Sequence, residues 1–261
     1  MEQCVATEAE RLDIETVAPV AGPGEPAAPA TAPRPQNPIN RVNFSFLVFA
    51  HLMAVAAVLY LVFVKFSWWT LGLGALWSLA CGLSITGGYH RLFSHGSYRA
   101  GVGARLFYLL FGAASVQNSA LKWSSDHRMH HSNTDREGDP YDSTRGFWWS
   151  HVGWVIFRDA ADDVRDNVAD LERSSLVRLQ HRHYVALAIV MGGVVPLLLG
   201  LLWGDPIGAL LVAGFLRLVL QWHSTFSINS VAHLFGGKRP FAPASAPRES
   251  FWLARFTLGE G

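Results

Sequence analysis

Three histidines lie close together in a polar stretch of the chain, at His127, His130 and His131. Residues three and four positions apart on an α-helix face the same side, so these imidazoles are predicted to project from one helix face. Neutral imidazole is the commonest metal ligand, and a nitrogen set without thiolates favours iron, copper, nickel or zinc over calcium or magnesium. The simpler interpretation is a polar helix end that happens to be rich in histidine.

Two further clusters strengthen the metal interpretation. His90 and His95 follow an apolar run and would lie roughly 140° apart on an ideal helix. We therefore expect that the helix ends between them, as Gly96 allows, or that it contains a bulge of the kind found at functional sites. Asn229 and His233 are four residues apart and share a helix face. A single histidine near a helix end is usually structural, but three clusters favour a metal site.

Four stretches carry these residues: Gly87–His95, Asp126–His131 followed by Asp139 and Pro140, Gly146–Trp154, and Asn229–His233. Together they resemble the membrane fatty acid desaturases of the stearoyl-CoA delta-9 type, from about Asn43 to the end of the chain. The resemblance implies two iron ions that use dioxygen and two electrons. Its product is a cis double bond, expected at delta-9, in a long acyl chain.

The resemblance also assigns residues. It implies iron ligands at His90, His95, His127, His130, His131 and His233, with Asn229 reaching one iron through water. It places Gln117, Thr225 and Phe226 at the bend of an acyl tunnel. Phe226 replaces a tryptophan of the animal enzymes. Near the substrate entrance it places Asn118, Trp123 and Asp126. For each tunnel residue, packing or helix capping is the alternative interpretation.

The expected partners follow from the same resemblance. They are a long-chain acyl substrate, the surrounding membrane lipids and an external electron donor of cytochrome, ferredoxin or rubredoxin type with its reductase. No nucleic-acid partner is expected.

Other interpretations of the sequence are a hydroxylase or ketolase of the same histidine-box superfamily, a member without catalytic activity, a metal transporter, or a haem-binding bundle. A transporter needs ligands along a path through the bilayer, and a haem bundle needs facing histidines within the spans.

Two departures from the family pattern limit these expectations. In the family, a stretch like Leu258–Gly261 runs into a third histidine box, and three implied ligands are not in this sequence. We therefore expect the chain as written to bind metal incompletely and to be inactive.

The second departure concerns the substrate. Family members that bind the phosphates of coenzyme A carry basic residues where this chain has Ser124, Ser125 and an acidic run from Asp159. Phosphate recognition favours arginine and lysine, so acyl-lipid and acyl-CoA substrates both remain open.

The elements that position the histidines are predicted from hydropathy. Half of the 261 residues are hydrophobic. A span across ~30 Å of hydrocarbon needs ~20 apolar residues, and four segments qualify: 44–64, 68–88, 184–203 and 206–228. The predicted fold is an all-α integral membrane domain over 41–261, with two hairpins and a cytosolic helical cap over 89–183. Within that cap, Val164, Val168 and Leu171 recur at the spacing of an amphipathic helix.

The remaining segments are assigned by composition. Residues 1–40 are rich in Ala, Pro, Glu and Thr and are predicted to be a disordered cytosolic tail without a secretory signal. Residues 101–120 are apolar, but a span there would separate His90 from His127 across the membrane. We expect a helix in the interface or under the cap.

Basic residues predict the orientation. Lys65 is the only lysine or arginine in the two predicted outer loops, whereas residues 89–183 carry twelve. By the positive-inside rule, both termini and all three histidine clusters are predicted to be cytosolic.

The other histidines and the two cysteines are given structural roles. His223 precedes His233 by ten residues, about 15 Å along a helix, and is predicted not to be a ligand of the same site. His51 is predicted to be a hydrogen-bonded packing residue within the first span. Structural or interfacial roles are expected for His151, His181 and His183. Cys4 and Cys81 indicate neither a disulfide nor a thiolate metal site.

Overall fold

The computed structural model describes residues 38–157, 166–234 and 257, and these described residues belong to one compact unit. The predicted disordered tail lies outside the described residues up to residue 37. Within the described part, every regular element is a helix, apart from one isolated bridge between Ile39 and Phe157. The all-α prediction is confirmed.

Four continuous helical segments are long and apolar enough to cross a membrane: Arg41–Phe63, Trp68–Ser94, Tyr184–Trp203 and Pro206–Ala232. The first is α1 (Arg41–Phe63), and the second is α2 (Trp68–Leu83) followed by η1 (Ser84–Ser94). The third contains α8 (Tyr184–Ile189), η5 (Val190–Val194), α9 (Val195–Gly200) and η6 (Leu201–Trp203). The fourth contains α10 (Pro206–Ala209), η7 (Leu210–Leu216), α11 (Arg217–Ser227) and η8 (Ile228–Ala232). The prediction of four helices able to cross a membrane is confirmed, and the second and fourth helical segments extend a few residues beyond the predicted ends.

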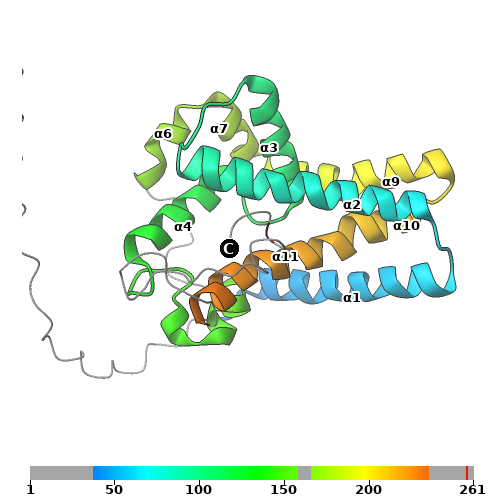
Figure 1. Ribbon diagram of the computed structural model, residues 1–261, viewed down its shortest axis with the longest axis horizontal. Helices are drawn as coiled ribbons and strands as arrows, with labels where there is room; N and C mark the ends of the chain where they lie inside the picture. The colour runs from blue at the N-terminus through cyan, green and yellow to red at the C-terminus, as the bar shows by residue number, and fades with distance from the viewer. Residues whose placement is uncertain (1–37, 158–165, 235–256, 258–261) are drawn as a thin grey trace, which may run out of the picture. The chain divides into compact units, whose positions relative to one another are not determined.

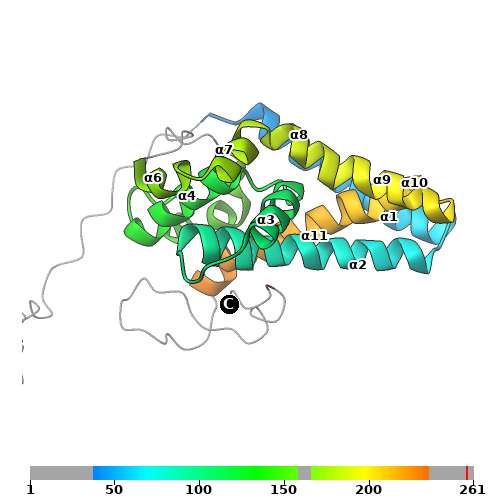
Figure 2. The same cartoon turned by 90° about the horizontal axis from the view of Figure 1, so that it is seen from above.

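The shorter helices gather at one end of these four segments (Figures 1 and 2). They include α3 (Val102–Ala114), α4 (Ala120–Asn133), α6 (Ala169–Glu172) and α7 (Ser175–Arg182). With 13 residues, α3 is about 20 Å long, too short to cross the hydrocarbon, which agrees with the prediction that it does not span. Val168 and Leu171 are buried, as the amphipathic pattern predicts, while Val164 lies outside the described residues.

The far end of the bundle is held by a buried carboxylate in the turn between the third and fourth segments. Asp205 is 1% exposed and accepts hydrogen bonds from the Tyr60 hydroxyl at 2.7 Å and the Thr70 hydroxyl at 2.5 Å. It also caps α10 by accepting from the Gly208 backbone N–H. These bonds satisfy a charge whose burial would otherwise be costly, and they join the turns of the two hairpins.

The segment that carries His90 is π-helical throughout Ser84–Ser94, so the expected bulge is present, and so is the expected helix end between His90 and His95. The helix ends at His95, whose backbone N–H donates to the His90 carbonyl. The wider turn brings the two imidazoles onto one side, with ring centroids 4.7 Å apart. Gly112 permits this helix to approach α3, because a Cβ there would overlap the Tyr89 ring.

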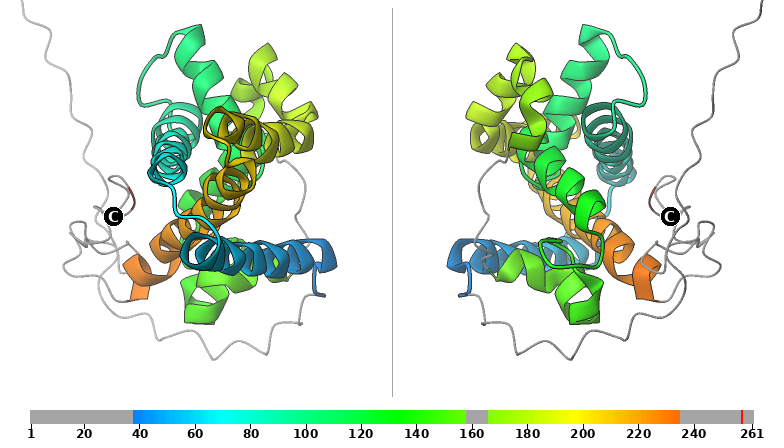
Figure 3. Two further views of the ribbon diagram at one scale, coloured as in Figure 1. Left: turned by 90° about the vertical axis from the view of Figure 1, so that its right-hand side faces the viewer. Right: turned by 90° about the vertical axis from the view of Figure 1, so that its left-hand side faces the viewer.

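Two short helices complete the cap on the other side of the bundle. They are η3 (Trp149–Gly153) and α5 (Trp154–Ile156), and they lie beside α1 (Figure 3). Asn43 in α1 donates through its side chain to the Val155 carbonyl, at 3.0 Å. This contact places His151 beside the first span and close to α11.

Candidate metal centre

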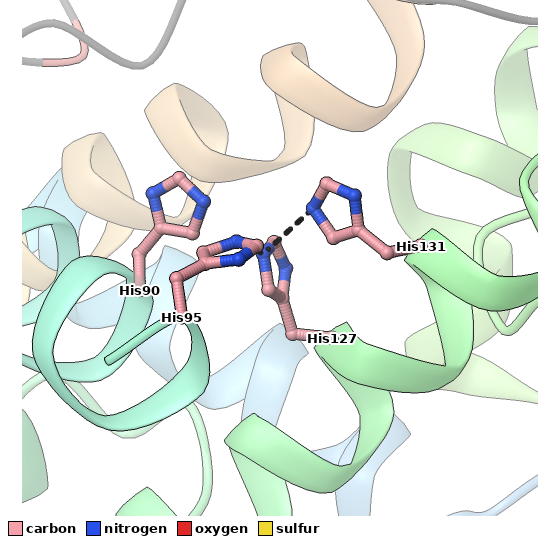
Figure 4. A group of neighbouring side chains, drawn as sticks. All are labelled: His90, His95, His127 and His131. Carbon is pink, nitrogen blue, oxygen red and sulfur yellow. Dashed lines mark hydrogen bonds between the residues drawn. The ribbon is translucent and has the colours of Figure 1, made fainter. Parts of the chain in front are cut away.

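Four of the predicted ligands meet between η1 and α4. His90 lies in η1, His95 is the residue that caps it, and His127 and His131 are one turn apart on α4 (Figure 4). One ring nitrogen from each of the four lies within 4.8 Å of the others. Nε2 of His127 is 3.0 Å from Nε2 of His95 and 3.0 Å from Nε2 of His131. A transition-metal ion bound ~2.0–2.1 Å from each nitrogen fits such spacings, so this donor set fits a metal.

The protonation of this four-histidine cluster suits ligation. Burial, followed by the neighbouring His90, lowers the pKa of His127 far below its ordinary value. Burial, followed by His130, lowers the pKa of His131 to about 4. Both rings are therefore neutral at pH 7, and a neutral imidazole has the free lone pair that a metal requires.

Side chains of α4 itself fix the cluster. Trp123 stacks on the His127 ring, with centroids 4.8 Å apart and an interplanar angle of 21°. The Arg128 guanidinium donates to the carbonyls of Phe93 and Ser94, each at 2.9 Å, directly before His95. Arg128 also pairs with Asp170 at 2.7 Å. Sequence reasoning missed Arg128, because an arginine inside a histidine-rich motif gives no signal of a partner 34 residues away.

The other two predicted histidine ligands form a pair. The rings of His130 and His233 have centroids 5.5 Å apart. Nδ1 of His130 donates to Asp139 at 2.8 Å, and Nδ1 of His233 donates to Asp135 at 3.2 Å. A carboxylate on one ring nitrogen leaves the other for a metal and fixes the ring orientation, as is typical of histidine metal ligands.

The two carboxylates are set by their own hydrogen bonds. Asp139 is 5% exposed and also accepts from the backbone N–H groups of Tyr141 and Asp135. Although burial opposes it, hydrogen bonds from His233 and Ser143 lower the pKa of Asp135 to about 2. Sequence reasoning gave neither aspartate a role. The signal available was their position four and eight residues after His131 in a turn-rich segment.

All six predicted histidines are thus brought into one group. His130 links the pair to the cluster, because its ring centroid is 5.6 Å from that of His131. Asn229 lies in η8, one turn before His233. The expectation that histidines from three separate segments converge agrees with this geometry, and their role as iron ligands stays a prediction.

Two of the predicted tunnel residues touch across a long stretch of sequence. The Gln117 side chain donates to the Thr225 hydroxyl at 3.0 Å. Gln117 lies in a strained turn, in which Val116 and Asn118 have φ values of 49° and 74°. A positive φ is a genuine outlier for a β-branched residue. Trp222 of α11 holds the turn by donating from Nε1 to the Val116 carbonyl at 3.2 Å.

The remaining predicted substrate residues are partnered within the protein. The Asn118 backbone N–H donates to the Tyr184 hydroxyl, and Asp126 pairs with Lys122 at 2.5 Å. Phe226 is buried against Trp154, with ring centroids 5.9 Å apart. Trp123 stacks on His127 of the four-histidine cluster, as described. Their contact with substrate stays a prediction.

The histidines given structural roles lie apart from this group. His51 is hydrogen-bonded, as predicted, to the Leu47 carbonyl and to His223. His223 bonds His151 at its other nitrogen, and His181 bonds the Ser119 hydroxyl. Cys81 is buried without a disulfide.

Comparison with known proteins agrees with this geometry. Residues 66–261 match the family model described as fatty acid desaturase. The chain is 44% identical over 182 residues to acyl-CoA desaturase 1 of Saccharomyces cerevisiae, covering 69% of this chain and 36% of that protein. It is 32% identical to stearoyl-CoA desaturase 5 of Homo sapiens, over 99% of this chain and 78% of that protein. It is also 32% identical to the sn-1 stearoyl-lipid 9-desaturase of Anabaena variabilis, over 89% of this chain and 82% of that protein.

The covered lengths differ among these relatives. The chain spans little more than a third of the two fungal acyl-CoA desaturases that it matches at 44% identity. The match to the family model extends over most of the chain and includes all six histidines of the group. The chain therefore belongs to the fatty acid desaturase family.

Proposed function

We propose that this chain is the membrane domain of an oxygen-dependent acyl desaturase that places a cis double bond at delta-9 of a long acyl chain. The observation that carries the proposal is the convergence of ring nitrogens from His90, His95, His127 and His131. The names of relatives that act on stearoyl substrates support the position of the double bond.

The proposed irons are held in two unequal places. The four-histidine cluster holds one iron, and His130 with His233 contributes to the second, with Asn229 acting through water. When bound, the irons supply the two-electron chemistry with dioxygen that removing two hydrogens from an unactivated chain requires. Asp139 and Asp135 fix the tautomers of His130 and His233, so that Nε2 of each ring is free to ligate.

The protein itself contributes by positioning the acyl chain. The strained turn at Val116–Asn118 presents Gln117 to Thr225, and we assign this pair to the bend that sets the reacting carbons. A bent tunnel selects one chain conformation before reaction, and holding reactants in place supplies a large part of many enzymatic rate enhancements. Trp123 stacks on His127, and we assign it to the wall of the substrate site beside the four-histidine cluster.

The surroundings of α4 favour an acyl-lipid over an acyl-CoA substrate. Ser124 and Ser125 are fully buried and bond Ser94 and Asn167. Lys122 is ion-paired to Asp126. In the described residues of α4, no cluster of unpaired basic side chains is presented to a nucleotide phosphate. The orientation inferred from lysine and arginine puts the metal centre and the electron donor's docking side in the cytosol.

The test is expression in a host membrane that supplies an electron donor, followed by mass spectrometry of the acyl products and measurement of iron per chain. Residues 1–261 are compared with a version extended through a third histidine box. We expect a delta-9 monounsaturated product and two irons per chain from the extended version. Hydroxylated or keto products would instead indicate another histidine-box oxidase. Full iron without product would indicate a non-catalytic member.

A further inference from the structure

A second group of histidines joins three elements away from the metal centre. His51 of α1, His223 of α11 and His151 of η3 form a hydrogen-bonded row. At one end, Nδ1 of His51 lies 2.7 Å from the Leu47 carbonyl oxygen. In the middle, Nε2 of His51 lies 3.1 Å from Nε2 of His223, and Nδ1 of His223 lies 3.0 Å from Nε2 of His151. At the other end, Nδ1 of His151 lies 2.9 Å from the Ser230 hydroxyl oxygen. Every ring nitrogen in the row has a partner, so flipping any ring would put carbons where two contacts are made.

One end of the row determines where the hydrogen of His51 lies. The Leu47 carbonyl can only accept a hydrogen bond, so Nδ1 of His51 carries a hydrogen. A neutral imidazole has a single ring hydrogen. Nε2 of His51 therefore directs a bare lone pair at His223.

The other end determines the hydrogens of His151 and His223. The Ser230 hydroxyl donates its hydrogen to the Phe226 carbonyl at 2.8 Å, and its oxygen lies 2.9 Å from Nδ1 of His151. The hydroxyl can then only accept from His151, which places the ring hydrogen of His151 on Nδ1. Its Nε2 then accepts from Nδ1 of His223, and Nε2 of His223 is left bare as well.

Two lone pairs consequently face each other at 3.1 Å, an arrangement that repels unless a cation lies between them. Nitrogens bound to one ion at ~2.0–2.1 Å are roughly 3.3–3.4 Å apart at the tetrahedral angle and about 3.1 Å apart when the angle narrows to roughly 100°. In the four-histidine cluster, Nε2 of His127 faces Nε2 of His95 at a similar distance, 3.0 Å. We propose that Nε2 of His51 and Nε2 of His223 bind a second, accessory transition-metal ion of the zinc type, with His151 orienting His223.

The protein leaves the two nitrogens open to further ligands. His223 is exposed and His51 is half-buried, so the protein does not enclose either ring. Phe147 stacks on His151, with centroids 5.2 Å apart, and Phe226 packs edge-on at 5.7 Å. Among the described residues, this row contacts carbonyl, hydroxyl and aromatic groups. An all-nitrogen pair without carboxylates favours zinc, nickel or copper over magnesium and calcium.

Such an ion would fasten the first span to the fourth. The site is independent of the proposed desaturase activity, because none of its residues belongs to the six-histidine group. An ion that binds the folded protein alone stabilises it by mass action. Zinc therefore raises the melting temperature of the folded protein without changing its product.

The experiment uses the iron-loaded protein in detergent, titrated with Zn²⁺ and desalted, with zinc and iron counted per chain. We expect the wild type to retain one zinc beyond its iron. His51→Ala and His223→Ala should weaken zinc binding at least ~10-fold and abolish the zinc-dependent rise in melting temperature. His183→Ala, which changes an exposed histidine elsewhere, is the matched control and should behave as the wild type.

Unchanged iron content in the variants shows that they are folded, so the zinc count is decisive. His51→Gln and His223→Gln keep a polar side chain and provide a second pair if the alanine variants lose iron. Equal zinc retention in the wild type and in the His51 and His223 variants would overturn the proposal. The absence of any extra zinc in the wild type would also overturn it, because the two nitrogens would then share only a proton, or the Ser230 hydroxyl would donate to His151.

Discussion

The four-histidine cluster and the His130–His233 pair are built in different ways. The cluster takes its rings from η1 and α4, which are close in sequence and are tied together by Arg128 through the Phe93 and Ser94 carbonyls. The pair joins α4 to the end of the fourth span, about 100 residues away, through carboxylates on one loop. The cluster is locally complete, whereas the pair depends on distant segments being in place.

Removing the central ring of the cluster should have the largest effect. His127→Ala deletes the nitrogen that lies 3.0 Å from both His95 and His131. Since changes to outer-shell groups alone cost ~10–100-fold in metal affinity, we expect at least ~100-fold weaker binding at this site. Iron per chain after dialysis, measured by mass spectrometry, should fall by half or more. Iron equal to that of the His183→Ala control would refute the assignment.

His233→Ala should separate the two regions. The change removes one ring of the pair and leaves the four-histidine cluster untouched, so in the version extended through a third histidine box we expect one iron to be lost and one to remain. Iron counting together with Mössbauer spectroscopy would distinguish a single remaining iron from two half-filled sites. The comparison fails if His233→Ala and His127→Ala lose iron in the same proportion, because the regions would then act as one unit.

The carboxylates should have smaller and unequal effects. Asp139→Asn and Asp135→Asn keep the side-chain shape and weaken the fixing of one ring each. We expect ~10-fold weaker iron retention, with the larger loss for Asp139, which is buried and accepts two backbone N–H groups as well. Competition with a chelator, followed over time, measures both. A larger loss for Asp135→Asn would reverse this ranking.

The smallest expected effect depends on pH. The folded pKa of Asp135 is about 2, below the unfolded value of ~3.9, so its stabilising contribution is complete above about pH 4 and is lost as the pH falls toward 2. In metal-free protein, the difference in melting temperature between the wild type and Asp135→Asn should therefore shrink from about pH 5 to about pH 3. A difference that grows on acidification would contradict the assigned sign.

The sequence predicts those features of the fold and the site that depend on local sequence pattern. The spans follow from apolar length, and the histidine motifs follow from side-chain type and spacing. The sequence offered a helix end or a bulge after His90 as alternatives, whereas the structure has both, in a segment that packs closely on α3 at Gly112. Asp135 and Asp139 act only because a loop folds back on α4. The row of His51, His151 and His223 joins residues up to 172 positions apart, and no periodicity predicts such a meeting.

Asp205 has a consequence for how the membrane domain assembles. Two hairpins can enter a bilayer one after the other, each with its own backbone hydrogen bonds complete. The second hairpin alone carries a carboxylate whose hydroxyl partners, Tyr60 and Thr70, belong to the first. Until the hairpins dock, that charge lacks those partners and is unfavourable to bury. The Asp205 carboxylate therefore has all of these hydrogen-bond partners only when the two hairpins are joined, at the end of the bundle away from the histidine group.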